Sequence, residues 1–347
     1  MKKILSAILY TAAAATIAGC AKEVSVGSND ASKRFFDAWI HVNHPTVTPT
    51  DLGVYVLEET EGNGTTVEKD GFAIVDCIIT DLEGNIKDYT DKETAKQLGQ
   101  YDTAYYYGPK IWTTTEGTIQ AGVADALIGM KAGGMRKVAI PGWLLTYKVY
   151  DNAEDYLNPP KDELTTSTTY DNAIYKFNVR DYVKDINEYQ IGQIDEYLKD
   201  NPQLGLTVKD SLQRGFYYKE LEAPQTLDSL KSDTTVYINY TGRLLNGLVF
   251  DTTIEKTAKD NGIWSSTRTY EPTKINWGES YDKITMGSSN SGTIDGFALT
   301  LWKMRAFEKG IGVFYSPLGY GYNGSGASIP GYSPLIFEIE IVAEPED

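Results

Sequence analysis

The sequence predicts an α+β protein made of two copies of one domain. Runs that alternate apolar and polar residues, as strands do, dominate the chain, and each half has one short apolar helix-like segment late in its sequence. Runs of strands with a single helix favour an antiparallel sheet that covers that helix. The length of 347 residues is enough for about two hydrophobic cores.

Composition excludes several classes of function. The chain has 48 acidic and 32 basic side chains, a formal net charge of −16, which argues against binding the phosphate backbone of nucleic acid. Its two cysteines, Cys20 and Cys77, and two histidines, His41 and His44, are too few for a zinc or iron site. We therefore expect no metal, no cofactor and no nucleic-acid partner.

Residues 1–19 resemble a bacterial lipoprotein signal peptide. Lys2 and Lys3 precede an apolar run of about 15 residues, too short to span a membrane as a mature helix, and the small residues Ala18 and Gly19 precede Cys20. In such signals the cysteine thiol is lipidated and becomes the first residue. The alternative is a plain cleaved signal peptide in which Cys20 has no role.

A lipid anchor at Cys20 implies a place in the cell envelope of a diderm bacterium. We expect the outer membrane, with the protein facing the periplasm, and the cell surface is the alternative. Residues 21–33 are small and polar and predict a flexible tether. Cys77 is then left without a disulfide partner, although this compartment permits disulfides.

Each half of the mature chain begins with a predicted helix. The first has Phe36 and Ile40 at helical spacing and stops before Pro45. The second starts with the capping-box pattern of Asp185 and Glu188 and stops before Pro202. An alternating, strand-like run follows each helix, at 53–58 and at 215–220.

Further segments match between the halves in the same order. Gly53 and Gly215 lie 162 residues apart, and Gly84 and Gly247 lie 163 apart. The apolar helices at 119–130 and 294–304 correspond, as do the closing strands at 175–179 and 335–341. This period far exceeds that of solenoid repeats, so we expect a duplicated domain. The predicted parts are a tether and short helix (20–45), a first domain (46–182), a linker helix (183–205) and a second domain (206–347).

The second copy carries five motifs in a fixed order. They are a tyrosine strand with a glycine turn and a Phe-Asp pair (236–251), a segment that opens the helix (284–297), a run that ends in a tyrosine and a glycine (304–321), an Ile-Pro tip (328–330) and the last strand (335–340). In this order the motifs resemble those of the FKBP family of peptidyl-prolyl cis/trans isomerases. The resemblance implies that each domain is a twisted antiparallel sheet wrapped around a short helix, and that the activity is prolyl isomerisation.

The resemblance also implies a set of site residues. An apolar slot that strips water from an X–Pro amide favours the twisted state over the planar one, against a barrier of about 18–20 kcal/mol, and requires no nucleophile, metal or cofactor. The N–H of Ile294 and the hydroxyl of Tyr320 would bind substrate carbonyls, and Asp251 would lie at the edge, oriented by Tyr240. The slot itself would be lined by Tyr240, Phe250, Phe297, Ile329 and Phe337. Taken singly, Phe250, Ile294 and Phe337 would be core residues in any strand-rich domain.

The first copy has lost most of this set. Alignment of Gly84 with Gly247 places Cys77 at Tyr240, Lys87 at Phe250, Gln120 at Ile294 and Val123 at Phe297, so that only Asp88, Tyr147 and Phe177 remain. We expect the first domain to be catalytically weak or silent, with a role in partner binding, substrate holding or spacing.

The second copy departs from the family pattern in two places. An insertion over 252–283 carries Trp264 and Trp277, and it could cap, extend or block the slot. Phe307 stands where the family has a glycine after Met304, which puts the local turn in question.

The leading hypothesis is a lipid-anchored prolyl isomerase and folding helper that acts on proline-containing, unfolded or partly folded polypeptides. One alternative is a non-catalytic FKBP-like binding or chaperone lipoprotein. Another is a surface lipoprotein that binds glycans, which rests only on the tyrosine and tryptophan content.

Overall fold

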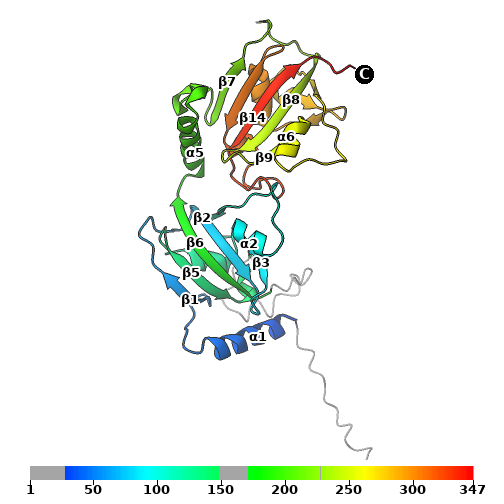
Figure 1. The fold of residues 1–347 in the computed structure, drawn as a ribbon. Helices are drawn as coiled ribbons and strands as arrows, with labels where there is room; N and C mark the ends of the chain where they lie inside the picture. The colour runs from blue at the N-terminus through cyan, green and yellow to red at the C-terminus, as the bar shows by residue number, and fades with distance from the viewer. Residues whose placement is uncertain (1–27, 148–170, 227, 347) are drawn as a thin grey trace, which may run out of the picture.

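The computed structural model describes residues 28–147, 171–226 and 228–346 (Figure 1). The predicted signal peptide, Cys20 and the first part of the tether lie outside these residues. No helix among the described residues is both long and apolar enough to cross a membrane.

The chain forms two antiparallel sheets with few helices, which confirms the predicted α+β class (Figure 1). We call the part with β1 to β6 domain 1 and the part with β7 to β14 domain 2. The strands of domain 1 are β1 (Tyr55–Thr60), β2 (Phe72–Thr80), β3 (Ile86–Tyr89), β4 (Lys110–Thr113), β5 (Met135–Ile140) and β6 (Ala173–Val183). Those of domain 2 are β7 (Phe216–Glu222), β8 (Thr235–Leu244), β9 (Val249–Thr252), β10 (Thr273–Asn276), β11 (Thr285–Met286), β12 (Ser291–Gly292), β13 (Lys309–Phe314) and β14 (Leu335–Val342).

Short helices accompany both sheets. The α-helices are α1 (Ser28–Asn43), α2 (Lys92–Gln97), α3 (Ala121–Leu127), α5 (Ile186–Asp200), α6 (Glu255–Asp260) and α7 (Asp295–Lys303). Single 3₁₀ turns are η1 (Gly142–Leu144), η3 (Pro202–Leu204), η4 (Val208–Asp210), η5 (Tyr281–Lys283) and η6 (Ser316–Leu318). The sequence analysis missed α2 and α6. Asp91 marks the start of α2, because its carboxylate accepts a hydrogen bond from the N–H of Thr94 at 2.7 Å.

The two sheets share one strand order. Domain 1 runs β1-β5-β6-β2 with β3 and β4 both paired to β2, and domain 2 runs β7-β13-β14-β8 with β9 and β10 both paired to β8. The turn glycines correspond as well: Gly84 and Gly247 have φ of +90° and +88°, a conformation that glycine adopts without steric cost. The chain therefore contains the same fold twice.

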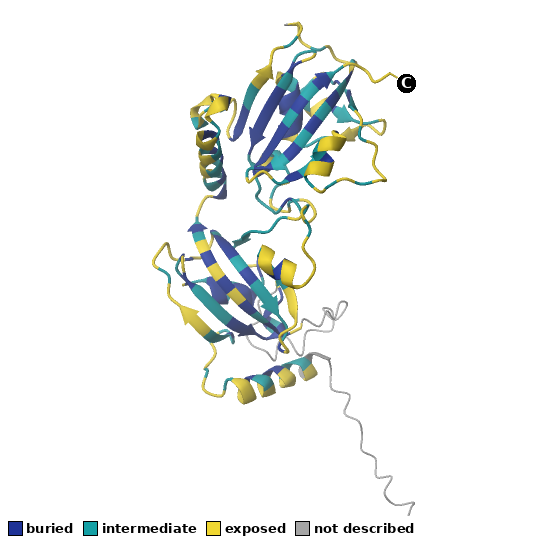
Figure 2. Cartoon of the chain, in the orientation of Figure 1, coloured by how far each residue is buried: buried dark blue, intermediate teal, exposed yellow. Residues whose placement is uncertain are grey.

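One helix in each domain packs into the inner face of its sheet, and the buried strand residues gather there (Figure 2). The second residue of each helix is glycine for a steric reason. A Cβ on Gly122 of α3 would lie 2.5 Å from the side chain of Ile140, and one on Gly296 of α7 would lie 2.3 Å from the ring of Phe314. These close approaches bring the start of each helix against the strands, where the slot is expected.

A second helix packs on the outer face of each sheet. In domain 1, α1 buries Phe36 and Ile40 next to Ala139 of β5, and in domain 2, α5 buries Ile194 and Leu198 next to strands β7 and β13. The helix ends agree with the sequence: α1 stops at Asn43, and the carboxylate of Asp185 caps the start of α5. The segment predicted as a linker helix thus packs on domain 2.

The tether prediction was wrong for residues 28–33, which form the first part of α1. The amide of Asn172 donates to the carbonyl and the hydroxyl of Ser32, at 3.0 and 3.1 Å. These bonds tie the beginning of the helix to domain 1, a contact that the small, polar composition of this segment could not reveal.

The insertion over 252–283 extends the sheet. Its strand β10 pairs with β8, and β11 then pairs with β10, so β10 lies between β8 and the segment at 284–287. Trp277 is buried and stacks on Trp302 of α7, with ring centroids 5.8 Å apart and planes at 16°. Trp264, by contrast, is exposed.

The turn before β13 keeps its shape without the expected glycine. Phe307 has a φ of +59°, and Gly133, at the corresponding place three residues after Met130, has a φ of +82°. A side chain in this left-handed region costs roughly 1–2 kcal/mol. The ring of Phe307 is largely exposed, so packing offsets little of that cost.

Candidate functional site

The predicted slot residues of domain 2 meet around one ring. Phe337 of β14 lies with its centroid 5.1 Å from that of Phe297 on α7, 5.6 Å from Phe250 on β9 and 6.2 Å from Tyr240 on β8. A fourth ring, Phe314 of β13, stacks on Phe337 at 5.9 Å. The sequence analysis did not include Phe314, although its place on the strand next to β14 could have suggested it.

A charged group adjoins these rings. The hydroxyl of Tyr240 donates to Asp251 Oδ2 at 2.6 Å, and the guanidinium of Arg268 pairs with Oδ1 of the same carboxylate. Burial, and then the charge of Asp251, raise the pKa of Tyr240, so its proton stays on the hydroxyl. Arg268 comes from the insertion, and sequence reasoning missed it because no spacing rule links it to Asp251.

Two hydrogen-bond donors lie near the same rings. Ile294 occupies the N-cap of α7, and its N–H donates to no residue that the structure describes. Tyr320 is 36% exposed, and its pKa is raised by partial burial and then by Asp251. Ile329 is buried in the same apolar cluster as Phe297 and Phe337.

Burial divides the set into a floor and a rim. Tyr240, Phe297, Ile329 and Phe337 are buried, so of the three residues that could be plain core residues only Phe337 lies in the core. Phe250, Asp251, Ile294 and Tyr320 reach solvent in part. An apolar ligand group would therefore lie on a floor of aromatic rings, with a free N–H, a hydroxyl and a carboxylate around it.

The strand register corrects the predicted alignment of domain 1. In domain 2, Phe337 of β14 lies opposite Gly242 of β8 and Gly312 of β13. The corresponding positions in domain 1 are Ile79 of β2 and Val138 of β5, and the residue of β6 that lies opposite both is Tyr175. Phe177, which the sequence alignment placed there, lies two residues further along β6 and is fully buried. Domain 1 therefore keeps an aromatic ring at this position, as predicted, but the residue is Tyr175 and not Phe177.

A cavity of about 240 Å³ lies at this place in domain 1, and Tyr322 and Tyr332 of the β13–β14 loop complete its lining. Gln120 and Val123 line it together with Tyr147 and Tyr175, and the hydroxyl of Tyr175 donates to Gln120 Oε1 at 3.4 Å. Burial raises the pKa of Tyr175 to about 12. Trp112 of β4 also lines the cavity, a residue that the sequence analysis missed. Gln120 thus places a polar side chain in this cavity, where the sequence alignment sets Ile294 in domain 2.

The described residues contain no group of three or more His, Cys, Asp or Glu that could hold a metal ion. Cys77 is buried in the core of domain 1, and burial raises the pKa of its thiol to about 12. Such a thiol stays protonated and unreactive at neutral pH.

Comparisons with known proteins identify the family of this chain. A family model described as FKBP-type peptidyl-prolyl cis-trans isomerase matches residues 228–342. The chain is also 30% identical over 139 residues to FK506-binding protein 2 of Dictyostelium discoideum, a match that covers 40% of this chain and 84% of that protein. The chain belongs to the FKBP-type peptidyl-prolyl cis-trans isomerase family.

Two further proteins are similar to this FKBP-type chain. A probable FKBP-type peptidyl-prolyl cis-trans isomerase of Haemophilus influenzae is 32% identical over 130 residues, which is 38% of this chain and 43% of that protein. The match thus spans less than half the length of the Haemophilus protein. The crystal structure of the three FKBP domains of wheat FKBP73 aligns over 85% of this chain and 95% of that one, with 14% identity and a TM-score of 0.28.

Proposed function

We propose that domain 2 catalyses the cis/trans isomerisation of X–Pro bonds in polypeptides, with the predicted residues as its site. The observation that supports this most strongly is the convergence of four aromatic rings on Phe337, next to a carboxylate held by Tyr240 and Arg268. Phe337 and the four rings around it come from four strands and one helix, so their meeting depends on the whole domain.

The slot would act by solvent exclusion. Rotation about the X–Pro bond breaks amide resonance and reduces its charge separation, so an apolar floor favours the twisted amide more than the planar one. The N–H of Ile294 would donate to a substrate carbonyl, and the hydroxyl of Tyr320 would donate to another. The hydroxyl of Tyr240 is already engaged by Asp251, which leaves that tyrosine ring to serve as a wall.

We propose further that the mature protein is anchored in the cell envelope by a lipid on Cys20 and assists folding there, on the periplasmic side of the outer membrane. The basic, apolar and small residues of 1–19 support this proposal. Replacement of Cys20 by serine tests it: the native protein should fractionate with membranes and carry the mass of acyl chains, and the variant should do neither. A native protein without added mass would refute the anchor.

A protease-coupled assay tests the isomerase proposal. The rate at which a Leu-Pro tetrapeptide converts from cis to trans is measured with the full chain and with Phe337→Ala. We expect a rate well above the uncatalysed one for the native chain, and the rate left in Phe337→Ala reports any activity of domain 1. A native chain no faster than the uncatalysed reaction would favour the non-catalytic binding alternative.

A further inference from the structure

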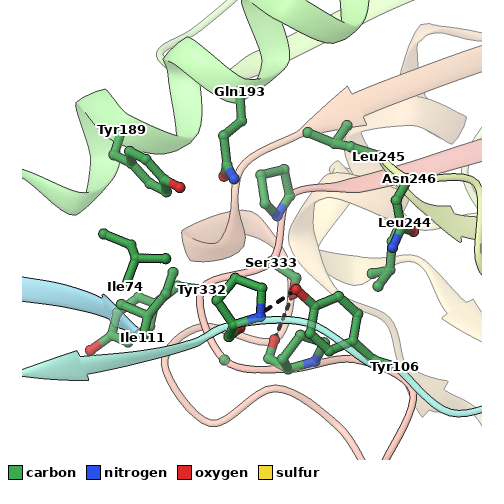
Figure 3. Close-up of a pocket in the computed structure, with 14 residues that line it drawn as sticks. Ile74, Tyr106, Ile111, Tyr189, Gln193, Leu244, Leu245, Asn246, Tyr332 and Ser333 are labelled. Atoms are coloured by element: carbon green, nitrogen blue, oxygen red, sulfur yellow. Dashed lines mark hydrogen bonds between the residues drawn. The ribbon is translucent and has the colours of Figure 1, made fainter. Parts of the chain in front are cut away.

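The loop between β13 and β14 of domain 2 lies directly against domain 1. The N–H of Tyr106 donates to the carbonyl of Ala327 at 2.9 Å, and the ring of Tyr332 meets that of Phe72 edge to face at 5.5 Å. At this junction Tyr106, Tyr189 of α5 and Leu244 of β8 surround a small cavity of about 150 Å³ (Figure 3). The β13–β14 loop therefore contacts domain 1 directly and borders, together with Leu244 of domain 2, the small cavity at the junction.

A much larger cavity, of about 810 Å³, opens beside this junction. It is lined by residues of β3, β4, the segment 105–108 and the loop 326–331, and we call it the interdomain groove. Its volume lies within the range of about 300–1,000 Å³ that is typical of ligand sites. Ile111, Trp112 and Tyr322 also line the domain 1 cavity, so the two spaces adjoin.

The lining of the groove is aromatic and electrically almost neutral. Tyr322 is 72% exposed and Tyr105 is 47% exposed, and Tyr89, Tyr107 and Trp112 add further rings. Of the charged side chains, Lys110 pairs with Asp88 inside the groove. Lys87 pairs with Asp81 at 3.0 Å. Such a surface favours an uncharged ligand with apolar or aromatic groups.

Two observations favour a polypeptide as that ligand. β4 lies at an edge: it pairs with β2 alone among the described strands, so the peptide groups on its other side have no strand partner. An extended chain can add to such an edge through main-chain hydrogen bonds. The groove also adjoins the slot, because Pro330 lines the groove while the preceding residue, Ile329, is part of the slot floor.

We propose that the interdomain groove binds an extended, uncharged segment of the same client polypeptide whose proline enters the slot of domain 2. Only the entry of the client's proline into the slot rests on the proposed isomerase function; the binding of the extended segment in the groove does not. Domain 1 then holds the client next to the site, and the exposed ring of Tyr322 and the ring of Trp112 are the main contacts.

The test uses a fluorescein-labelled, proline-free peptide of alternating Thr, Val and Tyr, about six residues long as is usual for a strand. Fluorescence anisotropy measures its affinity for the full chain. We expect Tyr322→Ala and Trp112→Ala to weaken binding at least about tenfold, as for central aromatic contacts. Phe35→Ala, which removes an exposed aromatic ring on α1, is the matched control and should bind as the native chain does.

Tyr322→Ala keeps the test decisive, because this mostly exposed side chain can be removed without a cost in packing, whereas Trp112 also contacts Phe177. A peptide N-methylated at alternate residues should lose binding if the chain adds to the edge of β4. Absence of binding to the native chain, or equal binding by Tyr322→Ala, would overturn the proposal. The proposal would also be overturned if the native chain bound a soluble oligosaccharide instead of the peptide and the same variants abolished that binding.

The two proposals fail separately. Isomerisation of the tetrapeptide reports the slot, and binding of the proline-free peptide reports the groove. A peptide that joins Leu-Pro to the strand-like segment should bind at least about tenfold more tightly than the segment alone, because the second contact becomes intramolecular. This gain should disappear in Phe337→Ala, and equal affinities of the two peptides would refute a single continuous client path.

Discussion

Phe337→Leu is the substitution that best distinguishes an effect on isomerase activity from an effect on folding. Phe337 is 5% exposed and its ring contacts four others, those of Tyr240, Phe250, Phe297 and Phe314. Leucine retains most of the buried apolar volume but offers no ring edge or face. The change therefore removes the centre of the aromatic floor and leaves the strand and the core largely filled.

The expected magnitude follows from those four contacts. Aromatic pairs contribute about 0.5–1.5 kcal/mol each beyond burial, and pairs that share one ring do not add fully. We expect domain 2 to lose about 2 kcal/mol of unfolding free energy. If the ring stabilises the twisted amide by about 1.4–2.7 kcal/mol, kcat/KM falls about tenfold to a hundredfold.

The assay is the protease-coupled reaction, performed well below the unfolding temperature of the variant. The control is Phe36→Leu, which replaces a buried ring of α1 in the same way; among the described aromatic rings it meets that of Tyr55, edge to face at 5.7 Å. It should lose stability and keep kcat/KM. Native kcat/KM in a folded Phe337→Leu protein would refute the reasoning, because the floor of the slot would then have no role in catalysis.

Three further predictions follow from single contacts. Tyr240→Phe removes the donor that lies 2.6 Å from Asp251 Oδ2, and because Arg268 still pairs with this partly exposed carboxylate, we expect a loss of only about 1 kcal/mol in urea unfolding. A loss above about 3 kcal/mol would show that Arg268 does not compensate. Phe307→Gly should raise the thermal unfolding temperature of domain 2, since it relieves a φ of +59° at a gain of about 1 kcal/mol, and a fall would show that the exposed ring has an important contact. Burial raises the pKa of Cys77 from 9.0 to about 12, so the stability that its neutral thiol confers is complete below pH 9 and is lost as the pH rises towards 12. Cys77→Ala should flatten this alkaline decline in unfolding free energy, and an unchanged decline would assign it to other groups such as Tyr175.

Local sequence signals were sufficient to predict the helix ends and turns that depend on residues close together in the chain. The ends of α1 and α5 follow from the residues before Pro45 and from the cap at Asp185. The turns at Gly84 and Gly247 follow from a backbone conformation that favours glycine. These features depend on neighbours a few residues away, which a sequence displays directly.

The register of domain 1 could not be obtained in this way. Tyr175 and Phe177 lie on the same face of β6, two residues apart, so either satisfies the alternation of a strand. Only the pairing of β6 with both β2 and β5 identifies Tyr175 as the counterpart of Phe337. The missed partner Arg268 is a similar case, because it lies 17 residues after Asp251 and only the folding of the segment between α6 and β10 brings the two side chains together.

The sequence by itself determined the duplicated α+β architecture, the family of the second domain and the aromatic residues that were expected to line one site, because these depend on residue types in a fixed order. Only the tertiary structure decided which rings touch, that the insertion adds a strand beside β8, and that the β13–β14 loop and β4 enclose a groove. The physical reason is that these contacts join residues far apart in the chain. Their energies depend on three-dimensional packing, which residue spacing does not encode.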